Sequence, residues 1–127
     1  MTTETVSKDL MMECRTKLLR MKDEIMNRSR MHRQEFDSFE KGSGDEIDVA
    51  VAQIAEDHFL LTQDRMRRQL MEIEFALARI ANGEFGMCEE TQEPIEMERL
   101  LAIPYTRLSI EGAEIREAMK RRTATSL

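Results

Sequence analysis

Two aspartates, Asp45 and Asp48, lie three residues apart in the stretch GDEIDVA, between two long segments without glycine or proline. Paired carboxylates can act as a general acid and base, bind a metal ion, or cap a helix. An exposed turn offers no pocket that would exclude water or shift a pKa. No nucleophile–base set and no phosphate-binding loop occurs elsewhere in the chain. We therefore expect no enzyme, and two readings stay open: helix capping and negative charge offered to a partner.

A second candidate site starts at Cys88, where the spacing of a zinc ribbon would require a second cysteine at position 91. Thr91 stands there, and the region of a second ligand pair holds Ser109 and Gly112. One thiol cannot build the four-coordinate site of structural zinc, so we expect no bound metal. Cys88 itself is either a buried, apolar-like residue or a reactive thiol.

Two long helices are predicted to position the aspartates. The first, from about residue 7 to 36, repeats apolar residues in steps of three and four, and its pattern weakens at Arg28 and His32. The second runs from about Glu46 to Asn82, with Gly83 as its C-cap. The first seam consists of Met11, Cys14, Leu18, Met21 and Ile25, and the second of Met66, Leu70, Ile73, Leu77 and Ile80. A turn around Gly42 and Gly44, with Ser43 or Asp45 as the next cap, makes these helices an antiparallel hairpin.

The remaining chain changes character after Gly83, because glycine, proline and the single tyrosine appear there. We predict a small module without helix at 83–109, with short strands near Met87 and Tyr105, and a helix over about 110–122. The expected segments are an N-terminal segment at 1–9, a coiled-coil hairpin at 10–82 with its tip at 42–50, the module at 83–109, and a C-terminal helix and tail at 110–127. The predicted fold class is mainly α.

Composition excludes several classes of function. The formal net charge of the 127 residues is −6, which argues against a broad basic surface for direct, sequence-specific DNA binding. No apolar run approaches the roughly 20 residues of a membrane span, and the N-terminus does not resemble a secretory signal. We therefore expect a cytoplasmic protein with reduced cysteines. His32 and His58 have no partner at metal-ligand spacing and are expected on the seam or the surface.

The stretch FGMCEETQEPIEMERLLAIPYTRLSIEG resembles the C-terminal module of DksA/TraR-type transcription regulators. The matching residues are Phe85, Gly86, Cys88, Ile95, Arg99, Leu100, Ala102 and Pro104, and the four ligand positions fall on Cys88, Thr91, Ser109 and Gly112. The preceding hairpin fits the same family, and the tip motif D-x-x-D-x-A matches Asp45, Asp48 and Ala50. Because three ligand positions are non-ligating, the chain resembles the zinc-independent members.

The resemblance implies a regulator that binds bacterial RNA polymerase and inserts its tip into the secondary channel. Asp45 and Asp48 would then act near the active centre and change the stability of promoter open complexes. Ala50 would allow close approach, or serve only as a helix former. Arg65 would dock on an acidic rim of the channel, or remain a solvated arginine. We expect the protein to be a monomer. The alternative function is a coiled-coil adaptor for another protein, with no effect on transcription.

Two departures from the family bear on cofactors. Basic residues that help DksA-type members bind guanosine tetraphosphate, the alarmone of the stringent response, are matched here by Glu72, Ile103 and Ala113, so alarmone synergy is not expected unless Arg99 or Arg107 compensates. Without zinc, apolar burial must replace a folding contribution of about 10–16 kcal/mol. Five or six residues would suffice at roughly 1.5–3 kcal/mol each, drawn from Met87, Ile95, Met97, Leu100, Leu101, Ile103, Leu108 and Ile110.

Overall fold

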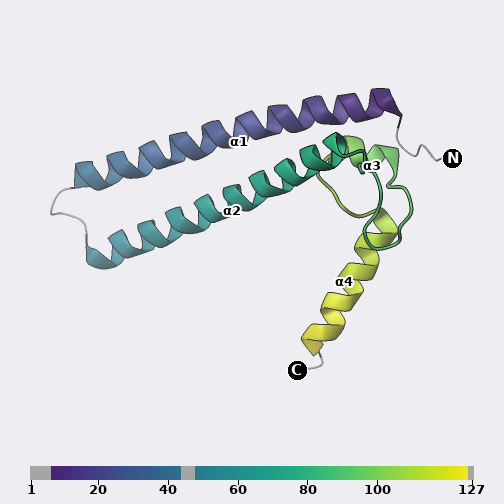
Figure 1. The fold of residues 1–127 in the computed structure, drawn as a ribbon. Helices are drawn as coiled ribbons and strands as arrows, with labels where there is room; N and C mark the ends of the chain where they lie inside the picture. Colours follow the sequence, from purple (N-terminus) through teal and green to yellow (C-terminus); the bar gives the residue numbers. More distant parts are fainter. Residues whose placement is uncertain (1–6, 44–47, 126–127) are drawn as a thin grey trace. The chain divides into compact units, whose positions relative to one another are not determined.

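The computed structural model describes residues 7–43 and 48–125, and within them it contains four helices (Figure 1). Helix α1 spans Lys8–Ser43, α2 spans Val49–Ala81, α3 spans Met97–Ala102 and α4 spans Ile110–Thr125. The predicted fold class, mainly α with two long helices, is confirmed.

Polar residues at the helix ends explain where the helices begin and stop. The Ser7 hydroxyl accepts a hydrogen bond from the Leu10 N–H at 3.1 Å, which caps α1. Ser109 caps α4 in the same way, through the Gly112 N–H at 3.0 Å. Beyond α2, Gly83 has a φ of 75°, and Glu84 N–H bonds to the Arg79 carbonyl at 2.8 Å. This is the Schellman arrangement, so the prediction of Gly83 as a C-cap is confirmed.

Several predicted boundaries and elements were wrong. Helix α1 continues seven residues beyond Phe36, through Gly42, to Ser43, because a glycine costs little in a last helical turn that solvent surrounds. Helix α2 begins at Val49 rather than Glu46.

The module after Gly83 also differs from the prediction. It contains helix α3, because the segment MERLLA consists of good helix formers between two prolines. Tyr105 is not in a strand, and Met87 forms only an isolated bridge with Pro94.

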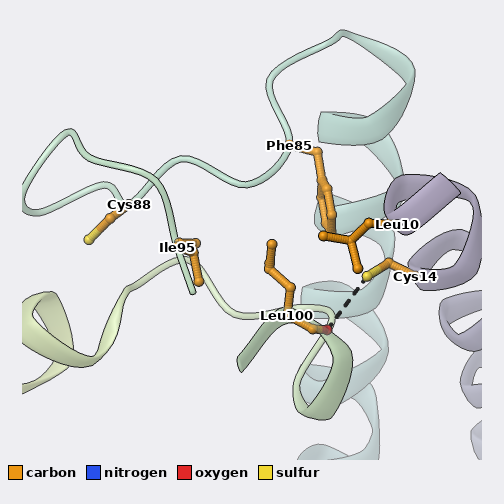
Figure 2. Close-up of a cluster of buried hydrophobic side chains, with 6 residues drawn as sticks. All are labelled: Leu10, Cys14, Phe85, Cys88, Ile95 and Leu100. Carbon is orange, nitrogen blue, oxygen red and sulfur yellow. Dashed lines mark hydrogen bonds between the residues drawn. The ribbon is translucent and has the colours of Figure 1, made fainter. Parts of the chain in front are cut away.

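The chain divides into two compact units. One unit comprises residues 1–19 and 72–127, so the start of α1 and the end of α2 belong with the small module. The other unit comprises residues 20–71. The core of the first unit brings together residues far apart in the sequence (Figure 2). Its buried members are Leu10, Cys14, Phe85, Cys88, Ile95 and Leu100. The Cys14 thiol also donates to the Leu100 carbonyl at 3.6 Å, which ties α1 to α3.

The unit of residues 20–71 contains the later part of α1 and the earlier part of α2, which lie side by side and antiparallel (Figure 1). Ile25 and Met66 are buried in its seam. Further along the seam, the contacts become polar and aromatic: Ser29 and His32 face Gln63, and His32 and Phe36 stack on Phe59. The weakened apolar pattern at His32 therefore marks a change of seam chemistry.

The residues expected to replace zinc are buried only in part. Ile95 and Leu100 lie in the core, but Met87, Met97 and Ile110 are 41%, 59% and 50% exposed. Their place is taken by Leu10 and Cys14 from α1 and by Phe85, so the module is stabilised by packing on the long helices as well as by its own side chains. Leu101, Ile103 and Leu108 are partly buried, the first and last against this core, so part of the expected set packs as predicted. Periodicity within the module did not show which face the first helix covers.

Candidate functional site

Asp48 is the described carboxylate of the predicted tip, and it caps α2. Its Oδ1 accepts a hydrogen bond from the Ala50 N–H at 3.2 Å, and its carbonyl accepts one from Ala52 N–H at 3.0 Å. The side chain is exposed, so its charge faces solvent at the positive end of the α2 dipole. Capping and presentation of charge therefore coexist in Asp48, whereas the sequence had favoured Asp45 or Ser43 as the cap. Asp45 lies outside the described residues.

The first turns of α2 expose an unusual amount of apolar surface beside Asp48. Val49, Val51 and Ile54 are 82%, 50% and 68% exposed, and the small Ala50 between them is exposed as well. A carboxylate beside exposed aliphatic groups suits a binding surface, because the partner can bury the aliphatic groups and pair with the charge.

Charge divides the unit of residues 20–71 into two zones that our sequence analysis missed. Residues 34–58 carry eight acidic residues and one basic residue, whereas residues 25–33 and 59–70 together carry six arginines and one aspartate. The acidic zone contains Glu35, Asp37, Glu40, Asp45, Glu46, Asp48, Glu56 and Asp57, with Lys41. The arginine zone contains Arg28, Arg30, Arg33, Arg65, Arg67 and Arg68, with Asp64. The signal was available in the sequence, but the net charge of the whole chain hides it.

Arg65 lies in this arginine zone and is exposed on α2. Its neighbours Arg67 and Arg68 both pair with Asp64, the latter at 2.6 Å. On the same unit, Arg30, Arg33 and Arg67 border a groove of about 560 Å³ whose other lining residues include Ile25, Phe59 and Met66. Arg65 itself does not line this groove, so the predicted docking residue shares the arginine zone with the groove's arginines but not their place at the groove.

The four predicted ligand positions come together in the small module. Cys88 is fully buried, and its Sγ accepts hydrogen bonds from the Ser109 hydroxyl at 3.4 Å and from the Thr91 N–H at 3.5 Å. A Cβ placed on Gly112 would come within 2.5 Å of this sulfur. The Cys88 sulfur thus occupies the space that a fourth ligand side chain would need.

The electrostatics of Cys88 follow from these contacts. Burial raises the pKa of the thiol, but the hydrogen bonds from Ser109 and Thr91 favour the thiolate more strongly and lower its pKa to about 6. Cys88 is thus buried in the core, as the first reading from the sequence expects, and it is hydrogen-bonded as well.

The residues at these positions do not fit a structural zinc ion. Zinc in such modules is held by four thiolate or imidazole ligands at about 2.0–2.3 Å. Here one cysteine is present, a backbone N–H points at its sulfur, and the glycine position leaves no room between Cβ and Sγ. No group of three His, Cys, Asp or Glu side chains with metal-binding geometry occurs among residues 7–43 and 48–125.

Glu72, at a position where the family resemblance expects a basic residue, is held within an ion-pair network. Arg107 donates from Nε to Glu72 Oε1 at 2.9 Å and from Nη1 to Glu89 Oε2 at 3.1 Å, and its guanidinium lies 5.0 Å from the centre of the Phe75 ring. The hydrogen bond to Glu72 is the main cause that raises the pKa of Arg107. Arg99 donates to the Leu108 carbonyl at 2.8 Å. Both arginines considered as compensating anion ligands therefore already have partners.

None of the described helices combines the length and the apolar character that crossing a membrane requires.

Comparisons with known proteins place the chain in a family. Residues 83–118 match the family described as the prokaryotic dksA/traR C4-type zinc finger. The chain is 36% identical over 105 residues to the RNA polymerase-binding transcription factor DksA of Caulobacter vibrioides, covering 83% of this chain and 74% of the relative. It is 33% identical to general stress protein 16O of Bacillus subtilis, covering 76% of this chain and 61% of that protein.

A solved structure extends the likeness to the fold. The transcription factor DksA2 from Pseudomonas aeruginosa superposes with a TM-score of 0.82 at 33% sequence identity, covering 91% of this chain and 88% of the other. Sequence identity above 30% along most of a relative, together with the matching fold, identifies the family: the chain belongs to the DksA/TraR family.

Proposed function

We propose that this protein is a non-enzymatic regulator of transcription that binds bacterial RNA polymerase directly. The proposal is supported by the likeness to an RNA polymerase-binding transcription factor along 83% of the chain. In this proposal the tip of the α1–α2 hairpin enters the secondary channel and changes the stability of promoter open complexes. Structural zinc takes no part, since the four ligand positions do not fit it.

The observation that carries the mechanism is the exposed, helix-capping carboxylate of Asp48. Its charge is fixed in position because its oxygen is bonded to the Ala50 N–H. Inside a confined channel, such a charge interacts more strongly with basic groups or a bound metal than it would in open water. Asp45 would add a second carboxylate. The effect on initiation depends on a difference in affinity between two states of the promoter complex.

Docking and regulation are assigned to different zones of the hairpin. Arg65 and the surrounding arginines would pair with an acidic surface of the polymerase, and this attraction would speed encounter. The acidic zone around Asp48 would then act at the active centre. If docking and regulation depend on different residues, a change at Arg65 should weaken binding to polymerase, and a change at Asp48 should reduce the effect on transcription.

The test uses Asp48→Asn, because asparagine caps a helix as well as aspartate does but carries no charge. The variant should bind core polymerase with wild-type affinity and should lose most of its effect on transcript yield at a ribosomal RNA promoter. Arg65→Ala should instead weaken binding. A wild-type effect of the double variant Asp45→Asn, Asp48→Asn would contradict the mechanism.

The alternative, an adaptor for another protein, is favoured by the exposed aliphatic residues of α2, which could serve any partner. A pull-down with purified core polymerase separates the two. Failure of the wild-type chain to bind would leave the adaptor as the function.

A further inference from the structure

Three polar side chains interrupt the apolar seam of the unit of residues 20–71. The Ser29 hydroxyl donates to Gln63 Oε1 at 2.8 Å, and Gln63 Nε2 lies 3.2 Å both from the Ser29 carbonyl and from His32 Nδ1. All three residues are half-buried. The Ser29–His32–Gln63 cluster therefore uses both ends of one amide group from α2 to bind two successive seam residues of α1.

The cluster is bounded by apolar layers on both sides. Toward the first unit, Ile25 and Met66 are buried in the seam. Toward the tip, the His32 ring stacks on Phe59 with centroids 5.1 Å apart, and Phe36 stacks on the same ring at 4.3 Å. His32 thus belongs to the polar cluster through Nδ1 and to the aromatic stack through its ring face.

Polar groups at such positions add little stability but discriminate between registers. A polar residue in a coiled-coil seam specifies register at a cost in stability, because other registers bury it without a partner. Shifting α2 by one heptad along α1 would place the Gln63 amide opposite Ile25 or Phe36. Each unsatisfied buried group costs about 1–3 kcal/mol, and the shift would also separate Phe59 from its two stacking partners.

We propose that the Ser29–His32–Gln63 cluster sets the register of α1 against α2 and thereby positions Asp48 along the hairpin. Gln63 is the positioning residue, since it alone contacts both other members. The register can be measured in the protein without polymerase. The effect of the register on transcription rests on the proposed function.

The direct test measures register in the absence of polymerase. Spin labels are attached through Ser38→Cys on α1 and Glu56→Cys on α2, both exposed positions, while both native cysteines are fully buried. The labelled protein with its wild-type seam should give one narrow distribution of distances between the two spin labels. In Gln63→Leu, the distribution should broaden or split, while the thermal midpoint should stay unchanged or rise. The matched control, Gln53→Leu, removes an exposed glutamine of α2 that bonds only to Asp57 among the described contacts and should leave the distribution narrow.

Ser29→Ala provides a second variant if Gln63→Leu does not fold. It removes only the hydroxyl bond and should broaden the distribution to a smaller extent. A distribution as narrow as the wild type in whichever of these variants folds would overturn the proposal.

Transcription assays separate this proposal from the proposed function. Gln63→Leu should retain polymerase binding within about threefold but lose most of its effect on initiation, because Asp48 no longer has one position. If the wild-type chain failed to bind polymerase, the proposed function would be wrong. The distance measurement would still test whether the cluster sets the register.

Discussion

Among single residues, the four predicted ligand positions form a hydrogen-bonded cluster around the sulfur of Cys88. Ser109 both caps α4 through Gly112 N–H and donates its hydroxyl proton to Cys88. Thr91 contributes its backbone N–H. A serine and a glycine at the second ligand pair are thus not merely lost ligands, since each now has a structural task.

The lowered pKa of Cys88 makes stability depend on pH. The folded state holds the thiol at a pKa of about 6, below the value of about 8.5 for a free cysteine, so the unfolded chain binds more protons between these values. The contribution of Cys88 to the free energy of unfolding should be complete above about pH 8.5 and be lost as the pH falls through about 6. Chemical denaturation at a series of pH values measures it.

Cys88→Ala is the control for this titration. Its free energy of unfolding should vary less between pH 6 and 8.5 than that of the wild type, and thiolate absorbance should vanish from the native titration apart from any signal of Cys14. Identical pH dependence of the two proteins would show that Cys88 does not ionise in this range.

Gly112→Ala should destabilise the first unit by about 1–3 kcal/mol, the usual cost of overpacking. The added Cβ would lie 2.5 Å from Cys88 Sγ and 3.3 Å from Glu90 Cβ. Urea denaturation gives the change in the free energy of unfolding. Adding Cys88→Ala should recover part of the loss, because the sulfur that causes the main clash is gone.

Gly42→Ala is the matched control for Gly112→Ala. It replaces another helical glycine, but outside its own helical turn no atom of the described residues lies within 4 Å of the added Cβ. It should leave stability unchanged or raise it by up to about 1 kcal/mol. Equal effects of the two alanine substitutions would contradict the steric argument.

Among the elements, the small module matches a family described as a C4-type zinc finger, although its residues do not fit the metal. The turn after Cys88 closes with Gln92 N–H on the Cys88 carbonyl at 3.0 Å, and Gln92 adopts a φ of 61°. Packing of α3 on Cys14 and of Phe85 beside Leu10 stabilises this turn from outside. The fold therefore depends on the long helices for contacts that zinc would otherwise supply.

Restoring the ligands should restore a zinc site. The triple variant Thr91→Cys, Ser109→Cys, Gly112→Cys should bind zinc with a rise in thermal midpoint, and cobalt should give the absorption of a tetrahedral thiolate site. Without metal it should be less stable than the wild type, because the new Cβ at position 112 crowds Cys88. A variant that also carries Cys88→Ser should bind cobalt more weakly, which controls for adventitious thiol binding.

At the scale of the whole molecule, regulation should be independent of zinc and of alarmone. Transcription from a ribosomal RNA promoter, measured with this protein and polymerase whose own metals are retained, should respond equally with and without a zinc-selective chelator. Guanosine tetraphosphate should add no synergy through Glu72, because a carboxylate paired with Arg107 stands where a cationic side chain would be needed. A loss of activity in chelator, or synergy that disappears in Arg107→Ala, would contradict these expectations.

Local sequence signals were enough to predict the two long helices, the C-cap at Gly83 and the family. These features depend on local periodicity, on the backbone preferences of single residues and on spacing, all of which can be read from neighbouring residues in the sequence. The division of charge between the acidic and arginine zones was equally readable, and the average over the whole chain concealed it.

Only the tertiary structure decided which partners these residues have. It assigned the α2 cap to Asp48, brought Leu10 and Cys14 into the core of a module more than 70 positions away, and paired Ser29 and His32 with Gln63. It also showed that Cys88, although buried in the core, accepts hydrogen bonds from Ser109 and Thr91. The physical reason is that burial, hydrogen bonding and pKa depend on atoms brought close by folding, and sequence periodicity indicates a buried face without naming what covers it.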